Sequence, residues 1–159
     1  MRGKRKYFLL ILFLFGFKKN EEININYYGE ILAKYDRNLF LTSNGFLLKI
    51  DDKKIIDSLS KMNLPEIVKI DFNTKHDSFK MNSIFYPISE LLKLIKERDI
   101  EFYLKIKYVE PIRISIYTID GKFITFGLGR FDKKINYLKN LIEFEDTLNL
   151  EVLSFLEGR

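Results

Sequence analysis

Apolar and polar residues alternate along most of residues 100–128. A period of two is typical of a strand with one buried face. The alternation predicts three antiparallel strands, with Asp120-Gly121 as the tight turn between the second and the third. The apolar positions of these strands are Ile100, Phe102, Leu104, Ile106, Tyr108, Ile112, Ile114, Ile116, Ile124, Phe126 and Leu128.

Two stretches have the spacing of an amphipathic helix. Pro87 suits the first position of a helix, and apolar residues follow it at helical intervals. A second stripe follows the third strand, and Asp132 is placed to cap that helix. The two stripes are Ile88, Leu91, Leu92 and Ile95, and Ile135, Leu138, Leu141 and Ile142.

The first half of the chain predicts further strands. Residues 31–35 form one strand, and residues 39–42 and 46–50 flank Asn44-Gly45, a strong hairpin signal. Residues 51–62 predict a helical turn, Leu64-Pro65 an extended step, and residues 71–83 a loop. A last strand begins at Leu148. This order predicts an α+β domain, a mainly antiparallel sheet with two helices packed on one face.

The chain opens with basic residues followed by an apolar run. At about 1.5 Å per residue the run spans roughly half of a ~30 Å hydrocarbon core. We interpret it as a short transmembrane signal anchor, with a cleaved signal or a buried core segment as alternatives. Residues 1–20 are then a basic cytoplasmic tail plus anchor, and residues 21–159 an extracytoplasmic domain of a single-pass inner-membrane protein. The predicted anchor residues are Tyr7, Phe8, Leu9, Leu10, Ile11, Leu12, Phe13, Leu14, Phe15 and Phe17.

Composition narrows the choice of function. The formal net charge is +5, and the first 19 residues contribute Arg2, Lys4, Arg5, Lys6, Lys18 and Lys19. The rest of the chain is close to neutral, which argues against a nucleic-acid-binding surface. Cysteine is absent, so neither a disulfide framework nor a thiolate metal site is possible.

Residue types that carry chemistry are few. His76, the single histidine, lies in a polar segment, and the acidic pairs Asp51-Asp52 and Glu145-Asp146 follow a predicted strand and a predicted helix. Residues 127–130 (GLGR) have the position of a phosphate loop without its third glycine, so a structural turn is the better interpretation. An enzyme using Asp51 and Glu143 stays open as an alternative, but we expect no enzyme, no cofactor, no metal and no small-molecule substrate.

Five motifs, in order, resemble one protein family. Residues 39–48 (LFLTSNGFLL) are similar to a "yLvD-x-x-G-vv" hairpin, and residues 64–65 (LP) to the step before its first helix. Residues 119–127 (IDGKFITFG) are similar to an "l-x-dG-x-x-v-x-lG" hairpin, and residues 133–142 to the helix after it. Residues 153–155 (LSF) resemble a closing "iDL-(R/S)-f" strand. The chain from Glu30 onward thus resembles the periplasmic β domain of the bacterial cell-division family FtsQ/DivIB.

The resemblance implies a non-enzymatic scaffold of the division septum, which binds membrane proteins of the FtsB/FtsL type through its C-terminal strand edge. On this chain the implied partner-binding residues are Ser154, Phe155 and Leu156, with Lys134 and Tyr137 beside them on the preceding helix. The alternative is that Phe155 and Leu156 are ordinary core residues. Two departures stand out. The family's small POTRA domain has no counterpart between the apolar run and Glu30, and Val152 stands where the closing strand has aspartate. An anchored or secreted envelope-binding domain of unrelated role is the alternative.

Overall fold

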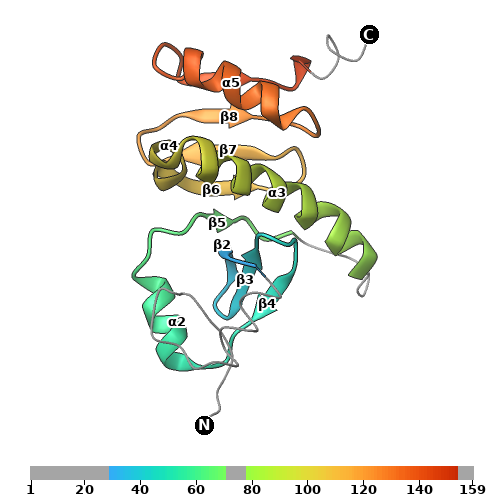
Figure 1. The fold of residues 1–159 in the computed structure, drawn as a ribbon, viewed down its shortest axis with the longest axis vertical. Helices are drawn as coiled ribbons and strands as arrows, with labels where there is room; N and C mark the ends of the chain where they lie inside the picture. Colours follow the sequence, from blue (N-terminus) through green and yellow to red (C-terminus); the bar gives the residue numbers. More distant parts are fainter. Residues whose placement is uncertain (1–28, 71–77, 154–159) are drawn as a thin grey trace.

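A computed structural model describes residues 29–70 and 78–153. In this part of the chain, eight strands form one sheet in the order β4-β3-β2-β5-β6-β7-β8-β9, and four helices accompany it (Figure 1). The strands are β2 Ile31–Asp36, β3 Leu39–Thr42, β4 Leu47–Lys49, β5 Glu66–Ile67, β6 Ile106–Glu110, β7 Ser115–Thr118, β8 Phe123–Thr125 and β9 Thr147–Asn149. The helices are α2 Lys53–Ser60, α3 Ser78–Arg98, α4 Ile100–Lys105 and α5 Phe131–Leu141.

The sheet is mixed, which confirms the α+β class and corrects the expectation of a mainly antiparallel sheet. The hairpins β2–β3–β4 and β6–β7–β8 are antiparallel. The pairs β2–β5, β5–β6 and β8–β9 are parallel. Parallel neighbours need a crossover connection. In this sheet each of the three crossovers contains at least one helix: α2 between β2 and β5, α3 and α4 between β5 and β6, and α5 between β8 and β9.

A short turn, a helix cap and a backbone hydrogen bond determine where the strands and the helix of the first half begin and end. Gly45 has φ +88° between β3 and β4, so the predicted Asn44-Gly45 hairpin is confirmed. Asp52 caps α2 by accepting a hydrogen bond from the Lys54 backbone N–H at 2.9 Å. The carbonyl of Pro65 accepts from the Lys34 N–H at 2.8 Å, which joins the extended step to β2.

The long helix α3 begins earlier than predicted. Pro87 lies inside it and not at its first position, and the predicted loop is helical from Ser78 onward. The Ser89 hydroxyl donates to the Tyr86 carbonyl at 2.8 Å, next to the proline that lacks a backbone donor. The predicted stripe is confirmed, since all four of its members are fully buried.

The first predicted strand of residues 100–128 is wrong in its first half. Residues 100–105 form α4, and Asp99 caps it by accepting from the Phe102 N–H at 3.2 Å. A helix presents the neighbours Phe102 and Tyr103 to the core and leaves Ile100 and Leu104 exposed, whereas a strand would have buried the even-numbered residues.

The three strands that follow α4 keep the predicted antiparallel order. A bulge at Lys107 shifts the register of β6, so Ile106 and Val109 face the core and Tyr108 faces solvent. The turn at Asp120-Gly121 is confirmed, with Gly121 at φ +89°. Two predicted core residues, Ile112 and Leu128, are exposed because they lie in turns beyond the ends of β7 and β8.

The helix α5 buries Ile135 and Leu138 as predicted, while Leu141 is partly exposed. The expectation that Asp132 caps it is wrong. Arg130 occupies the N-cap position with φ +56° and no side-chain capping bond, and the Asp132 carboxylate instead pairs with Arg98 at 2.7 Å. This ion pair joins the end of α3 to the start of α5.

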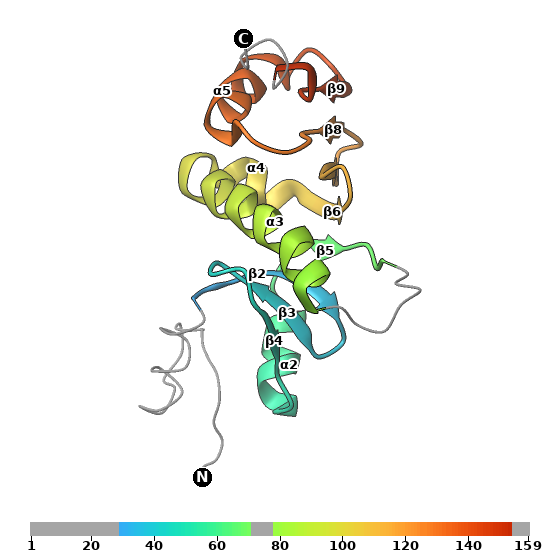
Figure 2. The ribbon, with the colours of Figure 1, turned by 90° about the vertical axis from the view of Figure 1, so that its right-hand side faces the viewer.

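One core cluster runs through both halves of the molecule. Figure 2 shows α3 crossing beside the strands, with α5 near β8 and β9 and α2 at the opposite end. Within the described residues, no helix is long and apolar enough to cross a membrane. The predicted anchor, residues 7–17, lies outside the described residues.

A buried hydroxyl links α4 to the first strand. The register of β2 against β3 shifts around Leu32, and the Tyr103 hydroxyl donates to the Leu32 carbonyl at 2.6 Å. Burial raises the pKa of Tyr103, and the Glu30 carboxylate raises it further. The tyrosine is therefore a neutral hydrogen-bond donor at neutral pH.

The variant Tyr103→Phe should lower the free energy of unfolding by about 1–3 kcal/mol, because it leaves a buried carbonyl without this donor. Denaturant titration measures the change. The control Tyr86→Phe alters an exposed side chain and should stay within about 0.5 kcal/mol of the parent. Equal effects of the two changes would contradict the assigned role of the hydroxyl.

Candidate partner-binding edge

The strand β9 is the last in the sheet order of the described residues (Figure 2). It pairs in parallel with β8, in the register Phe123↔Thr147, Ile124↔Leu148 and Thr125↔Asn149. The helix α5 is the crossover between the two strands, and Leu148 and Leu150 bury their side chains under it. One side of β9 is thus occupied by β8, and the other side forms an edge of the sheet.

Backbone groups along β9 alternate between these two sides. The Asp146 carbonyl accepts from the Phe123 N–H, and the Leu150 N–H donates to the Thr125 carbonyl, both at 2.8 Å. Since backbone direction alternates along a strand, Leu148 also bonds to β8, while Thr147 and Asn149 direct their N–H and C=O groups outward. No strand of residues 29–70 or 78–153 pairs with that outer side.

One end of β9 is clamped to the turn that precedes β7. Arg113 donates from Nη2 to Glu151 Oε1 and from Nε to Oε2 at 3.4 Å. The Glu151 side chain also lies against Gly127, where an added Cβ would collide with it. The guanidinium lowers the pKa of Glu151 through this hydrogen bond, which outweighs the opposing effect of burial.

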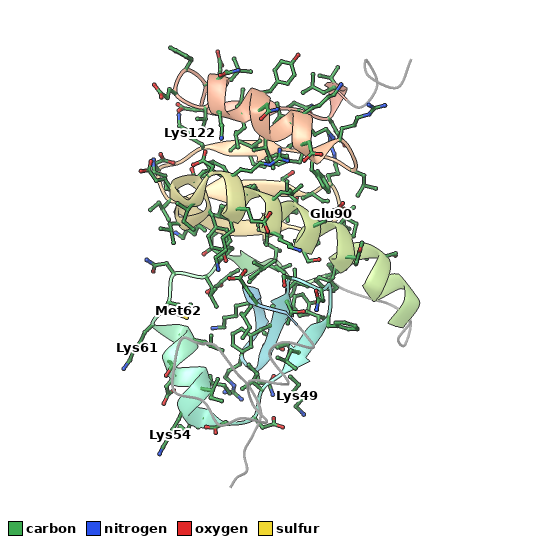
Figure 3. All side chains as sticks on the ribbon, in the orientation of Figure 1. Lys49, Lys54, Lys61, Met62, Glu90 and Lys122 are labelled. Carbon is green, nitrogen blue, oxygen red and sulfur yellow. The ribbon has the colours of Figure 1, made fainter. Side chains whose placement is uncertain are left out.

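The other end of β9 is held by Lys122, which Figure 3 labels close to the β7–β8 turn. Its Nζ donates to the Glu145 carbonyl and to the Asp146 carboxylate, both at 3.2 Å. Both clamps join β9 to the β7–β8 hairpin, so they fix the edge strand from its two ends.

The structure corrects the predicted role of Lys134. We expected it on the outer face of α5, but its side chain is fully buried. Its Nζ donates to the carbonyls of Phe126 at 2.6 Å and Leu128 at 3.3 Å. Burial lowers the pKa of Lys134, and the nearby Glu151 carboxylate opposes that shift. Lys134 therefore organises the loop before α5 and does not face a partner.

The loop at residues 127–130 consequently presents acceptors to a lysine. In a phosphate loop, backbone N–H groups converge on the ligand. Here the Phe126 and Leu128 carbonyls converge on the Lys134 ammonium. The loop acts as a structural turn that connects β8 to α5.

The remaining predicted partner-binding residues fall into two groups. Tyr137 is exposed on α5, with 45% of its surface accessible, and its role stays a prediction. Ser154, Phe155 and Leu156 lie outside the described residues, as does His76. The structure instead identifies Thr147 and Asn149, which were not predicted, as the edge positions, several residues before them in the chain. Their polar, exposed side chains on both sides of buried Leu148 are the signal in the sequence.

The carboxylates considered for an enzyme are not brought together. Asp51 precedes α2 and lies 4.0 Å from Lys49, whereas Glu143 follows α5, and the two helices lie at opposite ends of the molecule (Figure 1). Glu143 lines an open cavity of about 380 Å³ beside α4, together with Asp99, Lys105, Asp120 and Lys139. Both carboxylates and ammonium groups line it. Among the described residues, no group of three acidic or histidine side chains could hold a metal ion.

No protein-family model and no curated protein sequence matches this chain.

The pKa of the Glu151 carboxyl should lie below its usual value of 4.5, because the hydrogen bond from Arg113 favours the ionised carboxylate. A depressed carboxyl pKa stabilises the fold above 4.5, and this contribution is lost as the pH falls through the folded-state value. NMR titration of the side-chain carboxyl measures the shift. In Arg113→Ala the pKa should rise toward 4.5, and in the control Lys107→Ala it should not move. An unshifted Glu151 in the parent chain would show that the clamp does not form.

Proposed function

We propose that this chain is a non-enzymatic binding protein that captures partner proteins by strand addition at the outer edge of β9. The observation that carries the proposal is the outward direction of the Thr147 and Asn149 backbone groups at the end of the sheet. Such an edge is a template for an extended partner segment, whose main chain supplies affinity and whose side chains supply specificity.

The opposite edge of the sheet is less suited to this role. The strand β4 carries Lys49 at its end, and a lysine on an edge strand opposes pairing with another chain. In β9 the exposed side chains are those of Thr147 and Asn149, which carry no charge. Thr147 is also compatible with a strand partner because β-branched residues favour extended pairing.

We further propose that the partners are division proteins of the FtsB/FtsL type, and that the N-terminal apolar run anchors the domain outside the inner membrane. The support is the resemblance to the FtsQ/DivIB β domain together with the order of the elements. The hairpin at Asn44-Gly45 is followed by α2, β5, α3 and α4, and the hairpin at Asp120-Gly121 by α5 and β9. The strand β9 ends at Asn149, before the residues 153–155 that resemble the family's closing strand, and Leu153 is helical. In this proposal α3 and α5 cover one face of the sheet and leave the strand edge as the docking surface.

The variant Thr147→Pro tests the proposal. Proline removes the outward N–H of Thr147 and leaves the bonds of Leu148 to β8 in place. Capture of the division proteins from detergent-solubilised membranes should fall by about tenfold or more, because the partner strand loses a backbone hydrogen bond and meets the proline ring. Quantitative mass spectrometry of co-purified proteins gives the ratio.

Two controls separate binding from folding. Thr147→Ala keeps the backbone donor and should retain capture, and the melting temperature of Thr147→Pro should match that of Thr147→Ala. Undiminished capture by a folded Thr147→Pro would refute docking at this edge. Capture of envelope proteins other than coiled-coil division proteins, still sensitive to Thr147→Pro, would refute the division role and keep the edge.

A further inference from the structure

We infer that the segment docking on β9 is basic: an extended strand whose lysine or arginine side chains face the acidic ends of this edge. The inference rests on the proposed strand addition and adds the chemistry of the partner. It follows from the charges and the apolar side chains that border β9 on both sides.

Acidic residues surround the edge strand. Glu143, Glu145 and Asp146 lie in the four residues before β9, and Glu151 is the second residue after it. Residues 143–153 contain no lysine, arginine or histidine. Outside the first 19 residues the chain is close to neutral, so this concentration of negative charge is local and not a property of the whole surface.

Two of these carboxylates have partners of their own and two do not. Asp146 pairs with Lys122, and Glu151 pairs with Arg113. Glu143 and Glu145 are exposed, and neither forms an ion pair within the described residues. Glu143 lines the cavity beside α4 together with Lys105, Lys122 and Lys139, so Glu145 is the carboxylate that a cationic side chain of an incoming strand would find available at the start of β9.

Apolar side chains complete the surface. Phe144, which precedes β9, is 78% exposed, and Val152, which follows it, is 50% exposed. Such bulky exposed side chains at both ends of a short open edge supply the contact area that backbone bonds lack. We define the β9 docking surface as Phe144, Glu145, the outer edge of Thr147–Asn149, and Val152.

The same charges disfavour a second copy of this chain. A symmetric antiparallel pair of β9 strands centred on Leu148 would set Glu145 of one copy opposite Glu151 of the other. Like charges directly opposite each other destabilise a strand pair. A basic segment removes this repulsion and gains attraction from the same positions, which also steers its approach at low ionic strength.

Two matched peptides test the inference on the full chain in a non-ionic detergent. Both are short, end-capped and fluorescently labelled; valine alternates with lysine in one and with glutamate in the other. Fluorescence anisotropy should show that the lysine peptide binds about tenfold or more tightly than the glutamate peptide. The preference should shrink as salt is raised, because exposed charges are screened.

Variants of the chain locate the charge effect. Glu145→Lys should abolish or reverse the tenfold preference. The control Glu90→Lys changes an exposed carboxylate on α3 (Figure 3), which is not part of the β9 docking surface, and should leave the preference unchanged. A lysine peptide methylated on alternate backbone nitrogens should lose binding when the methyl groups face β9.

The outcomes separate the inference from the proposed function. Equal binding of both peptides, with binding still lost on backbone methylation, would overturn the basic partner and keep strand addition. Binding that survives methylation of either set of nitrogens, or no binding of either peptide, would overturn both. A dimer in sedimentation that Thr147→Pro dissociates would assign the edge to a second copy instead.

Discussion

The position of β9 depends on one connection, the crossover through α5. A chain that leaves β8 and returns as its parallel neighbour must travel back along the sheet, and an amphipathic helix is the usual means. Here α5 buries Ile135 and Leu138 on the way, and β9 then joins at the outer side of β8. The connection therefore determines both the direction of the last described strand and its place at the edge of the sheet.

Three interactions stabilise this crossover, and each joins α5 or a residue next to β9 to the β6–β8 meander or its loops. Lys134 donates hydrogen bonds to the carbonyls that follow β8. Arg113 forms an ion pair with Glu151, and Lys122 forms one with Asp146. The Arg113–Glu151 pair is exposed, and in the Lys122–Asp146 pair the carboxylate is exposed, so each pair contributes little by itself. Their effect is geometric, because together they keep β9 extended and its outer backbone groups aligned. A rigid edge binds with a smaller entropic cost than one that must first become ordered.

Local signals in the sequence predict much of this fold. Where a prediction from the sequence is wrong, the reason is physical. Asn44-Gly45, Asp120-Gly121 and the stripe from Ile88 to Ile95 are local, and the structure confirms them. The alternation in residues 100–105 is misleading, because a cap at Asp99 and the burial of Tyr103 favour a helix there. Lys134 was expected on the surface because its burial depends on carbonyls that tertiary structure brings together. The crossover connections likewise determine which strands pair in parallel. The apolar–polar pattern within a strand does not indicate the direction of its neighbour.

The central claim is that β9 is hydrogen-bonded on one side and open on the other. Hydrogen–deuterium exchange of individual amides, followed by NMR on the full chain, tests it most directly. The account predicts slow exchange for the Leu148 and Leu150 amides, which bond to β8, and fast exchange for those of Thr147 and Asn149. Equal protection of all four amides in the unbound protein would contradict it, because the outer edge would then already be paired.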